Sequence, residues 1–516
     1  MKSLDPELLK RLEEADCYPS EPGDVQVIQT HLSVVCLAGD RVYKLKKPVK
    51  FAFADFSTRQ LREQVCHDEL CLNRRLCPEI YLGVVPLRKS DEGQYSFCEG
   101  AGQVVDHAVL MERLPDDRLM ADVLAEGGVE ASQVEEIAHK IAKFHTETEP
   151  DAATQDAGSP ECQREAIVGN FAEMEGCAHV DRRLLEAVER RTRVGLDDLV
   201  AALECRARDG RVVDGHGDLH TRNIFLVAPP KIFDCIEFNK RFRCGDVATE
   251  NAFLIMDLIY RGRRDLAEHY LGSYIADTGD QGQADLMPML VSFRAMVRSK
   301  VAALAADDES VSAEERDGHA RSASQHLRLA GAALLDQTPH LLVFCGLPAT
   351  GKSTIARSLS EIAGWSHFSS DVVRKELAGA APDEKLSERY YRRDFSDSTY
   401  ERLIERACAA AEVAPAIADA NFPSVERRRQ LRRAANKRGC AVTFIWVRTD
   451  EHVVKQRLAE RSGEDAHGSD ADLSVYEDLK EKFEQPADGE GFDVIQLDGA
   501  ALTSNSLDQV LCHLLR

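Results

Sequence analysis

The stretch GLPATGKST, residues 346–354, constrains the fold of this chain more than any other segment. It follows the apolar run LLVFC and precedes the helix-like segment IARSLS. The spacing GxxxxGK[ST] between a strand and a helix is typical of a phosphate-binding loop, because glycines let backbone amides turn toward phosphate oxygens at a helix N-terminus. The residues that we expect to bind ATP here are Gly346, Leu347, Pro348, Ala349, Thr350, Gly351, Lys352, Ser353 and Thr354.

Two side chains of this loop are expected to act on the bound nucleotide. Lys352 is predicted to reach the β- and γ-phosphates, and the Ser353 hydroxyl to ligate Mg²⁺. ATP and Mg²⁺ are therefore the predicted cofactors. Over residues 341–516, strand-like runs alternate with helix-like runs, which favours a doubly wound parallel sheet covered on both faces. The C-terminal part is thus predicted to be an α/β P-loop NTPase domain.

Charged residues follow two of these predicted strands. Asp371 and Arg374 begin a helix after the second strand, and Asp419 ends the third. Asp371 is placed to take a proton from an acceptor or to hold Mg²⁺, with a helix N-cap at Ser370 or Asp371 as the alternative. Arg374 is predicted to bind a phosphate or an anionic substrate. Asp419 is predicted to hold Mg²⁺ or act as a general base, with a purely structural end to the strand as the alternative.

Residues 340–516 resemble the small P-loop kinases of the nucleoside-monophosphate-kinase, gluconate-kinase and zeta-toxin type, with which they share the loop and the strand–helix order. Arg457 and Arg461 lie four residues apart on one face of a predicted helix. The resemblance implies that both belong to a lid that stabilises the charge of the transferring phosphate. Surface ion pairs with Glu460 or Glu464 are the alternative. The resemblance identifies no acceptor.

A second motif, HGDLHTRN at residues 216–223, is followed by IFDCIEF at residues 232–238. In-line phosphoryl transfer needs one carboxylate beside the nucleophile and an Asn/Asp pair on Mg²⁺. The two segments resemble the aminoglycoside phosphotransferase and choline kinase branch of the α+β protein-kinase-like fold. This resemblance implies that Asp218 accepts the proton of the acceptor hydroxyl, that Asn223 ligates Mg²⁺, and that Asp234 holds the metals bridging the phosphates.

Residues 25–115 are predicted to form the small α+β lobe that such a fold requires. Two β-rich runs around Gly39-Asp40 predict a hairpin, residues 58–76 predict a helix, and two further strands follow. Strands, one helix and more strands are the order expected of this lobe.

Within this lobe, a lysine on the strand after the hairpin turn is expected to bind the ATP phosphates. Lys44 is the first choice and Lys46, which points the same way, is the alternative. Glu69 is predicted to pair with that lysine, with Glu63 as the alternative. Met111, in the segment VLMERLP, lies in what resembles the hinge that contacts adenine.

Residues 116–335 are predicted to be mostly helical, with an amphipathic helix over 131–147 and a loop over 148–161. The order of the two parts resembles a bacterial family of fused proteins described as aminoglycoside phosphotransferase-like/ATP-binding bifunctional proteins. This resemblance covers nearly the whole chain. It implies a kinase-like domain over 1–335 and a P-loop kinase domain over 341–516, joined by DQTPH.

Composition limits the partners of the chain. A net charge of −23 over 516 residues argues against general affinity for nucleic acid or anionic membranes. Residues 425–439 are rich in arginine and would suit a polynucleotide end, but solvated or salt-bridged arginines are the favoured interpretation. With no apolar stretch long enough to span a bilayer, no signal-peptide core and scattered cysteines, we expect a cytoplasmic protein.

The sequence therefore predicts an ATP- and Mg²⁺-dependent phosphotransferase with two centres that act on hydroxyl groups of small molecules. One alternative is a nucleotide-sensing or scaffold protein that binds ATP without transferring phosphate. Another is a polynucleotide-end kinase that uses the P-loop domain. Neither the acceptors nor the oligomeric state follow from the sequence.

Overall fold

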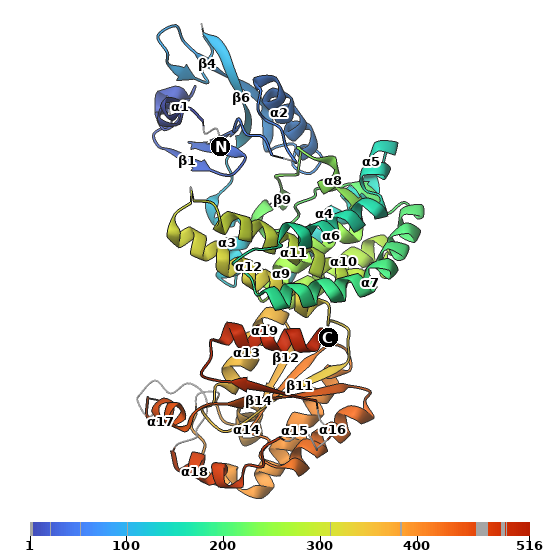
Figure 1. Ribbon diagram of the computed structural model, residues 1–516. Coiled ribbons are helices and arrows are strands. Elements are labelled where there is room, and N and C mark those ends of the chain that lie inside the picture. The colour runs from blue at the N-terminus through green and yellow to red at the C-terminus, as the bar shows by residue number, and fades with distance from the viewer. Residues whose placement is uncertain are drawn as a thin grey trace. The chain divides into compact units, whose positions relative to one another are not determined.

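The computed structural model describes residues 4–20, 22–51, 53–100, 102–309, 311–381, 384–460, 473–486, 491 and 493–516. Contacts divide the chain into two compact units, whose elements are labelled in Figure 1. The first unit contains residues 1–166 and 198–286, and the second contains residues 167–197 and 287–516. The segment HGDLHTRN therefore belongs to the first unit and the phosphate-binding loop to the second.

The first unit contains a six-stranded antiparallel sheet with the order β1-β2-β3-β6-β4-β5. Its strands are β1 (Val25–Gln29), β2 (Ser33–Ala38), β3 (Arg41–Lys46), β4 (Tyr81–Lys89), β5 (Tyr95–Ser96) and β6 (Gln103–Glu112). The predicted hairpin is confirmed, since Ala38 pairs with Arg41 across the turn and Gly39 takes a left-handed φ of 61°. The first β-rich run is divided into two strands, β1 and β2.

Two helices accompany this sheet. Helix α1 (Pro6–Arg11) is the short N-terminal helix, and Pro6 occupies its first turn. Helix α2 (Arg59–Asn73) begins after Thr58, whose side chain accepts a hydrogen bond from the Leu61 amide, and it contacts β4 and β6. The helix predicted over residues 58–76 from its apolar spacing is thus confirmed as α2.

The remaining helices of the first unit are α3 (Met120–Ala125), α4 (Ala131–Glu147), α5 (Ala152–Ala157), α8 (Lys240–Arg243), α9 (Val247–Tyr260) and α10 (Arg264–Thr278). Helices α6 (Pro160–Glu173) and α7 (Arg182–Arg208) cross the division. The helix predicted over 131–147 is confirmed, but the loop predicted over 148–161 is wrong in part. Asp151 caps α5 through the Thr154 amide, and Pro160 starts α6, so helix-starting residues were mistaken for loop residues.

Two short antiparallel pairs hold the HGDLHTRN segment. Strand β7 (Val212–Asp214) pairs with β10 (Cys244–Asp246), and β8 (Ile224–Phe225) pairs with β9 (Lys231–Ile232). The motif thus connects β7 to β8, and Asp234 lies two residues after the end of β9. These pairings bring the two motif segments together at one place in the fold.

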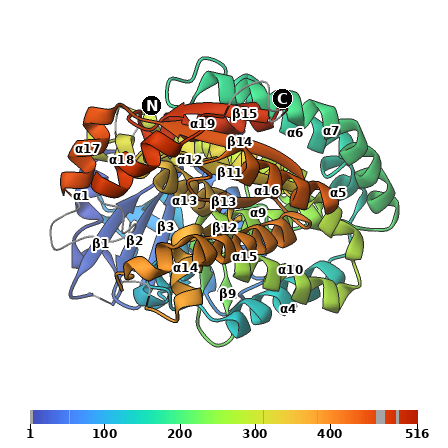
Figure 2. The ribbon, with the colours of Figure 1, turned by 90° about the horizontal axis from the view of Figure 1, so that it is seen from below.

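The second unit contains a five-stranded parallel sheet with the order β12-β13-β11-β14-β15. Its strands are β11 (His340–Cys345), β12 (Ser366–Ser369), β13 (Ala416–Asp419), β14 (Ala441–Arg448) and β15 (Asp493–Asp498). Its helices are α13 (Lys352–Ala363), α14 (Ser370–Ala378), α15 (Arg393–Ala411), α16 (Val425–Lys437), α17 (Glu451–Glu460), α18 (Leu473–Lys482) and α19 (Thr503–Leu514). The sheet lies between α13 and α19 on one face and α15 and α16 on the other, so the predicted doubly wound sheet is confirmed (Figures 1 and 2).

Helices α11 (Met287–Ala306) and α12 (Ala313–Ala333) belong to the second unit, although the sequence placed them in the first domain. Helix α12 packs against α13 and α19. Arg328 of α12 donates to both carboxyl oxygens of Asp508 on α19, at 2.6 and 2.9 Å. The division of the chain at residues 336–340 remains a prediction.

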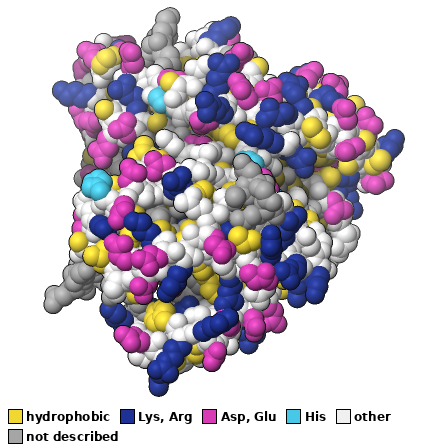
Figure 3. Space-filling view, turned by 60° about the horizontal axis from the view of Figure 1, so that its bottom comes forward, with side chains coloured by type: hydrophobic (Ala, Val, Ile, Leu, Met, Phe, Trp, Pro, Cys, Tyr) yellow, Lys and Arg dark blue, Asp and Glu magenta, His cyan; other side chains and the backbone are white. Residues whose placement is uncertain are grey.

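The described helices include none that is both long and apolar enough to cross a membrane. On the face of the molecule shown in Figure 3, lysines and arginines are interspersed with aspartates and glutamates. Charges of both signs therefore share the described part of this face.

Candidate active sites

Two lysines of β3 and one glutamate of α2 form a buried charged cluster in the first unit. Lys44 Nζ lies 2.8 Å from Glu69 Oε1 and 2.5 Å from Asp234 Oδ1. Lys46 Nζ lies 2.6 Å from Glu69 Oε2 and 2.6 Å from Glu237 Oε1. Of the two lysines that the sequence left open, Lys44 is the one that joins Glu69 to Asp234.

The charges in this cluster are set by burial and by opposite charges acting against each other. Burial acts to raise the pKa of the Glu69 carboxyl, but Lys44 and Lys46 outweigh it and lower that pKa to about 2. Burial acts to lower the pKa of Lys44, but Asp234 and Glu69 raise it well above its ordinary value. Glu69 and Lys44 are therefore both charged at neutral pH.

Glu63 and Met111 lie outside the buried cluster of Lys44, Lys46 and Glu69. Glu63 Oε1 is 3.5 Å from His107 Nε2, so this alternative glutamate pairs away from the lysines. Met111 is buried in β6, where it is paired with Val42 and Tyr81 of the neighbouring strands. A contact between the segment that begins at Met111 and adenine remains a prediction.

The HGDLHTRN segment holds two polar side chains together. Asn223 Nδ2 donates to Asp218 Oδ2 at 3.1 Å and to the Asp218 carbonyl at 2.9 Å. His220 Nε2 lies 3.2 Å from the same carboxyl oxygen. Gly217 has a φ of 83°, and a Cβ there would lie 2.8 Å from Arg243 Cα, so the loop requires glycine at this position. The proton acceptor and the metal ligand predicted from the sequence are thus adjacent.

Glu250 of α9 supports this loop from within the core. Its Oε2 accepts hydrogen bonds from the amides of His216 at 2.7 Å and Gly217 at 3.3 Å. Burial lowers the pKa of His216, and the neutral imidazole donates through Nε2 to the Phe233 carbonyl at 2.8 Å. Sequence analysis missed Glu250. The available signal was a carboxylate inside an otherwise apolar helix, where burial requires partners.

Asp234 has an unusual backbone conformation for a residue other than glycine, with a φ of 64°. Its amide donates to the Tyr81 hydroxyl at 3.1 Å, and its carboxylate meets Lys44. Strained conformations of this kind cluster at functional sites. Glu237, three residues later, pairs with Lys46 and was missed, because no local pattern in the sequence marks it.

The phosphate-binding loop of the second unit connects β11 to α13. Gly346 has a φ of 145°, and a Cβ there would lie 2.5 Å from the Val447 carbonyl oxygen. Gly351 is the N-cap of α13, in left-handed conformation. The Thr350 hydroxyl donates to the Leu347 carbonyl at 2.9 Å and thereby closes the loop. The loop geometry suits the binding of phosphates by backbone amides.

Arg457 of α17 contacts the backbone of this loop. It donates to the Ala349 carbonyl at 3.2 Å and to the Gly499 carbonyl at 2.9 Å. In this conformation the guanidinium therefore supports the loop, and its predicted contact with a transferring phosphate remains a prediction. Arg461 lies outside the described residues.

Asp419 ends β13 beside the loop and is 2% exposed. Burial acts to raise the pKa of its carboxyl, but His367, Lys352 and Ser353 outweigh it and lower that pKa. Its Oδ1 is buried without a hydrogen-bond partner among the described residues. An ionised carboxylate with an uncommitted oxygen next to the Ser353 hydroxyl fits a Mg²⁺ ion, which prefers oxygen ligands.

Asp371 and Arg374 both lie on α14. The N-cap is Ser369, whose hydroxyl accepts from the Asp371 amide at 3.3 Å, so the N-cap predicted at Ser370 or Asp371 is wrong by one or two residues. Arg374 donates to the Tyr390 carbonyl at 2.7 Å, and its guanidinium lies 4.8 Å from the centre of the Tyr391 ring. Arg374 is thus held by the segment before α15.

The arginine-rich helix α16 is largely engaged within the second unit. Arg428 is fully buried and donates to the Phe422 carbonyl at 3.0 Å. Arg427 forms an ion pair with Asp397, and Arg433 forms one with Glu426. The favoured interpretation of this helix, paired arginines, agrees with these contacts.

The fold and loop of the second unit define a P-loop domain, and a family model described as an AAA domain matches residues 341–486. The protein named Uncharacterized protein Rv2004c of Mycobacterium tuberculosis is 31% identical over 459 residues, which cover 87% of this chain and 89% of that protein. Uncharacterized protein Mb2027c of Mycobacterium bovis matches to the same extent. This chain therefore belongs to the family of these mycobacterial proteins.

About a third of this chain is also similar to solved structures. A sugar kinase from a Janibacter species is 18% identical, with a TM-score of 0.27, over 34% of this chain and 94% of that one. A gluconokinase from Sinorhizobium meliloti is 19% identical, with a TM-score of 0.26, over 35% of this chain and 94% of that one.

Proposed function

We propose that the protein is an ATP- and Mg²⁺-dependent kinase with two phosphoryl-transfer centres, one in each unit, that act on hydroxyl groups of small molecules. We further propose that the first centre belongs to an aminoglycoside phosphotransferase-like domain of the protein-kinase-like fold. The observation that carries the proposal is the convergence of the Lys44–Glu69–Asp234 cluster with the Asp218–Asn223 pair. The Phe233 amide, next to Asp234, donates to the Asn223 carbonyl at 3.1 Å and links the two groups.

In the first centre, each side chain has a role that its position supports. Lys44, oriented by Glu69, binds the phosphates of the donor. Asp234 and Asn223 supply oxygen ligands for Mg²⁺. Asp218 accepts the proton of the acceptor hydroxyl, because its carboxylate is held in place by Asn223 and flanked by His220. ATP, when bound, supplies the phosphoryl group.

In the second centre, the loop 346–354 binds the phosphates through its amides and Lys352. Ser353 and Asp419 hold Mg²⁺, which agrees with the uncommitted oxygen of Asp419. Asp371, Arg374, Arg457 and Arg461 are proposed to contact the acceptor or the transferring phosphate after closure. In the present conformation Arg374 and Arg457 are bound to backbone carbonyls, so this role requires that both side chains move.

The test is an ATP-consumption screen with a panel of hydroxyl-bearing metabolites. It is run on the wild type, Asp218→Ala, Lys352→Ala, and Lys437→Ala as an exposed control. We expect Asp218→Ala to abolish transfer to one set of acceptors and Lys352→Ala to abolish transfer to another, while Lys437→Ala changes neither. Transfer that survives in the double variant Asp218→Ala/Lys352→Ala would contradict the proposal. Binding of ATP–Mg²⁺ without transfer to any acceptor would instead support a nucleotide sensor.

A further inference from the structure

A cavity of about 660 Å³ lies in the first unit, and none of its lining residues belongs to the HGDLHTRN segment. It is lined by the segment that follows α2, the C-terminal half of α4, α5, the end of β7 and the start of α8, with Arg75, Lys140, Phe144, Asp214 and Lys240 among its residues. A volume of this size suits a small metabolite. Asp214 is part of the wall, and the HGDLHTRN segment begins two residues after it.

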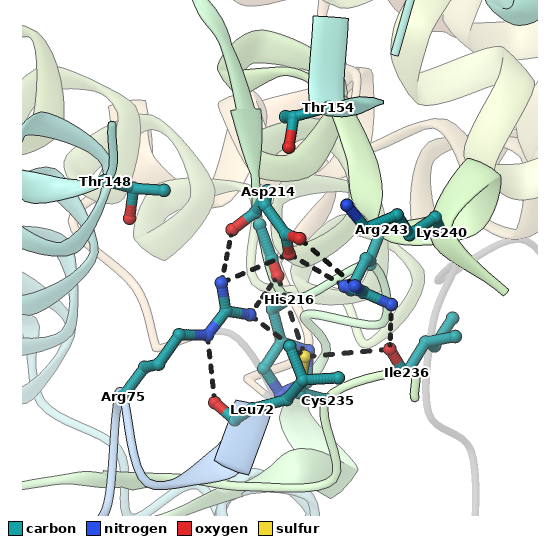
Figure 4. A network of polar contacts seen from close by, with 12 residues as sticks. Leu72, Arg75, Thr148, Thr154, Asp214, His216, Cys235, Ile236, Lys240 and Arg243 are labelled. Atoms are coloured by element: carbon teal, nitrogen blue, oxygen red, sulfur yellow. Dashed lines mark hydrogen bonds and ion pairs between the residues drawn. The ribbon is translucent and has the colours of Figure 1, made fainter. Parts of the chain in front are cut away.

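Two guanidinium groups share one carboxylate in this wall. Arg75 Nη1 donates to Asp214 Oδ1 at 3.1 Å, and Arg243 Nε donates to the same oxygen at 2.7 Å. Arg243 Nη2 also donates to Asp214 Oδ2 at 3.1 Å. Figure 4 shows Asp214 between the two arginines, with Lys240 and Thr154 nearby. This group of three therefore carries one net positive charge.

Lys140 adds a second cation to the cavity. Its Nζ donates to the Pro230 carbonyl at 2.8 Å, and within the described parts of the chain no carboxylate lies within ion-pair distance of it. Burial lowers the pKa of Lys140, as expected for an ammonium group that lacks a counter-charge. The other lysines differ, since Lys143 lies 3.8 Å from Glu147 and Lys240 lies 3.8 Å from Asp151. Glu149 also lines the cavity, whereas the group of Arg75, Arg243, Asp214 and Lys140 carries two net positive charges.

Arg75 also connects the cavity to the first centre (Figure 4). It donates to the Leu72 carbonyl at 3.0 Å, at the end of the helix that carries Glu69. It donates to the carbonyls of Asp214 at 2.7 Å and Gly215 at 2.8 Å, directly before the HGDLHTRN segment. Its Nη2 lies 3.5 Å from the sulfur of Cys235, the residue after Asp234. One side chain therefore contacts three segments that carry the proposed catalytic groups.

We propose that this cavity is a binding site for a small polyanion, such as a phosphorylated or polycarboxylate metabolite, with Lys140 and Arg75 as the recognising cations. The bound anion compensates the charge of Lys140 and fixes the side chain of Arg75, which donates to the Asp214 and Gly215 carbonyls. It thereby stabilises the backbone at residues 214–218. That this regulates transfer at the first centre rests on the proposed function, whereas the binding itself does not.

The binding test is calorimetry with pyrophosphate and, in parallel, with citrate, in buffer freed of divalent metal ions on a chelating resin. The full-length Lys352→Ala chain is the parent, because this change weakens anion binding at the phosphate-binding loop. We expect pyrophosphate or citrate to bind. Tighter binding of pyrophosphate would identify the ligand as a phosphate, and tighter binding of citrate would identify it as a carboxylate. Adding Lys140→Gln to the parent should weaken anion binding about tenfold or more, because one charge-assisted hydrogen bond is lost. Lys140→Arg and the exposed control Lys437→Gln should bind the anion as tightly as the parent does.

Binding that Lys140→Gln leaves unchanged, or no binding of either anion to a folded parent chain, would overturn the proposal. Circular dichroism verifies that each variant is folded. Hydrogen exchange supplies a second readout that is independent of activity. We expect the anion to slow amide exchange in residues 214–218 of the parent and to have no such effect in the Lys140→Gln variant. Unchanged exchange in the anion-bound parent would refute the link to the loop.

Discussion

At the scale of single residues, the first centre depends on a choice that the strand pattern leaves open. Residues 44 and 46 point to the same side of β3, so both lysines can face Glu69 of α2. Both reach Glu69, but Lys44 also reaches Asp234 while Lys46 reaches Glu237. The distinction therefore comes from a carboxylate that lies far along the chain.

Replacing Glu69 by glutamine should destabilise the first unit by about 3 kcal/mol, because two buried lysines lose a shared counter-charge. The matched control is Glu63→Gln, on the same helix but half-exposed and paired with His107. It should change stability by less than about 1 kcal/mol. Urea unfolding measures both. Equal effects of the two substitutions would show that the lysine cluster contributes nothing particular to stability.

The effect of Glu69→Gln on stability should also depend on pH. The Glu69 pKa falls from an ordinary 4.5 to about 2 in the fold, so charged Glu69 stabilises the fold fully above pH 4.5. That contribution is lost as the pH falls from 4.5 toward 2. The difference in unfolding free energy between wild type and Glu69→Gln should therefore be constant above this window and shrink within it. A difference that stays constant down to the lowest pH at which both proteins fold would contradict this assignment.

At the scale of elements, the phosphate-binding loop shows how the backbone restricts a sequence. Gly346 lies where a Cβ would collide with the Val447 carbonyl of β14, a neighbouring strand of the parallel sheet. The motif could be predicted from sequence because its glycines, lysine and serine are close together along the chain. The contact with Val447 could not, because it requires β14 to lie beside β11.

Gly346→Ala should abolish nucleotide binding at the second centre, because the loop must shift to relieve that collision. Gly379→Ala is a matched control, since Gly379 also has a left-handed φ, of 66°, but nothing lies within 4 Å of its Cβ position. The control should cost about 1 kcal/mol of stability and leave binding intact. Calorimetry with an ATP analogue, in a Lys44→Ala background that removes the proposed phosphate-binding lysine of the first centre, measures binding at this centre. Normal affinity in Gly346→Ala would refute a role for the tight loop.

At the scale of the whole molecule, the units do not follow the division expected from sequence. Helix α12 was assigned to the first domain because it precedes the linker, yet it packs against α13 and α19 of the P-loop fold. Periodicity marked the helix correctly but says nothing about which surface it covers. The buried pair of Arg328 and Asp508 is the clearest sign of this packing.

Arg328→Met should destabilise the second unit by about 3 kcal/mol, because it leaves Asp508 buried without its partner. The control is Arg182→Met, whose arginine is 86% exposed and pairs with Glu186 four residues later, so little should change. The double variant Arg328→Met/Asp508→Leu should recover part of the loss. Thermal unfolding followed by circular dichroism measures all three. No loss in Arg328→Met would mean that α12 packs against the P-loop fold only weakly.

Patterns of neighbouring residues were enough to predict several features of the protein. They located the phosphate-binding loop, the Asp218–Asn223 segment, the alternation that forms the parallel sheet and the helix over 131–147, since each is a pattern of neighbours. Other features became evident only in the folded chain. Lys44 joins Glu69 to Asp234, and Glu250 holds the HGDLHTRN loop. Arg457 donates to the backbone of the phosphate-binding loop, and α12 belongs to the second unit. Each of these depends on residues far apart in the chain, and burial and charge pairing select such contacts only once the chain has folded.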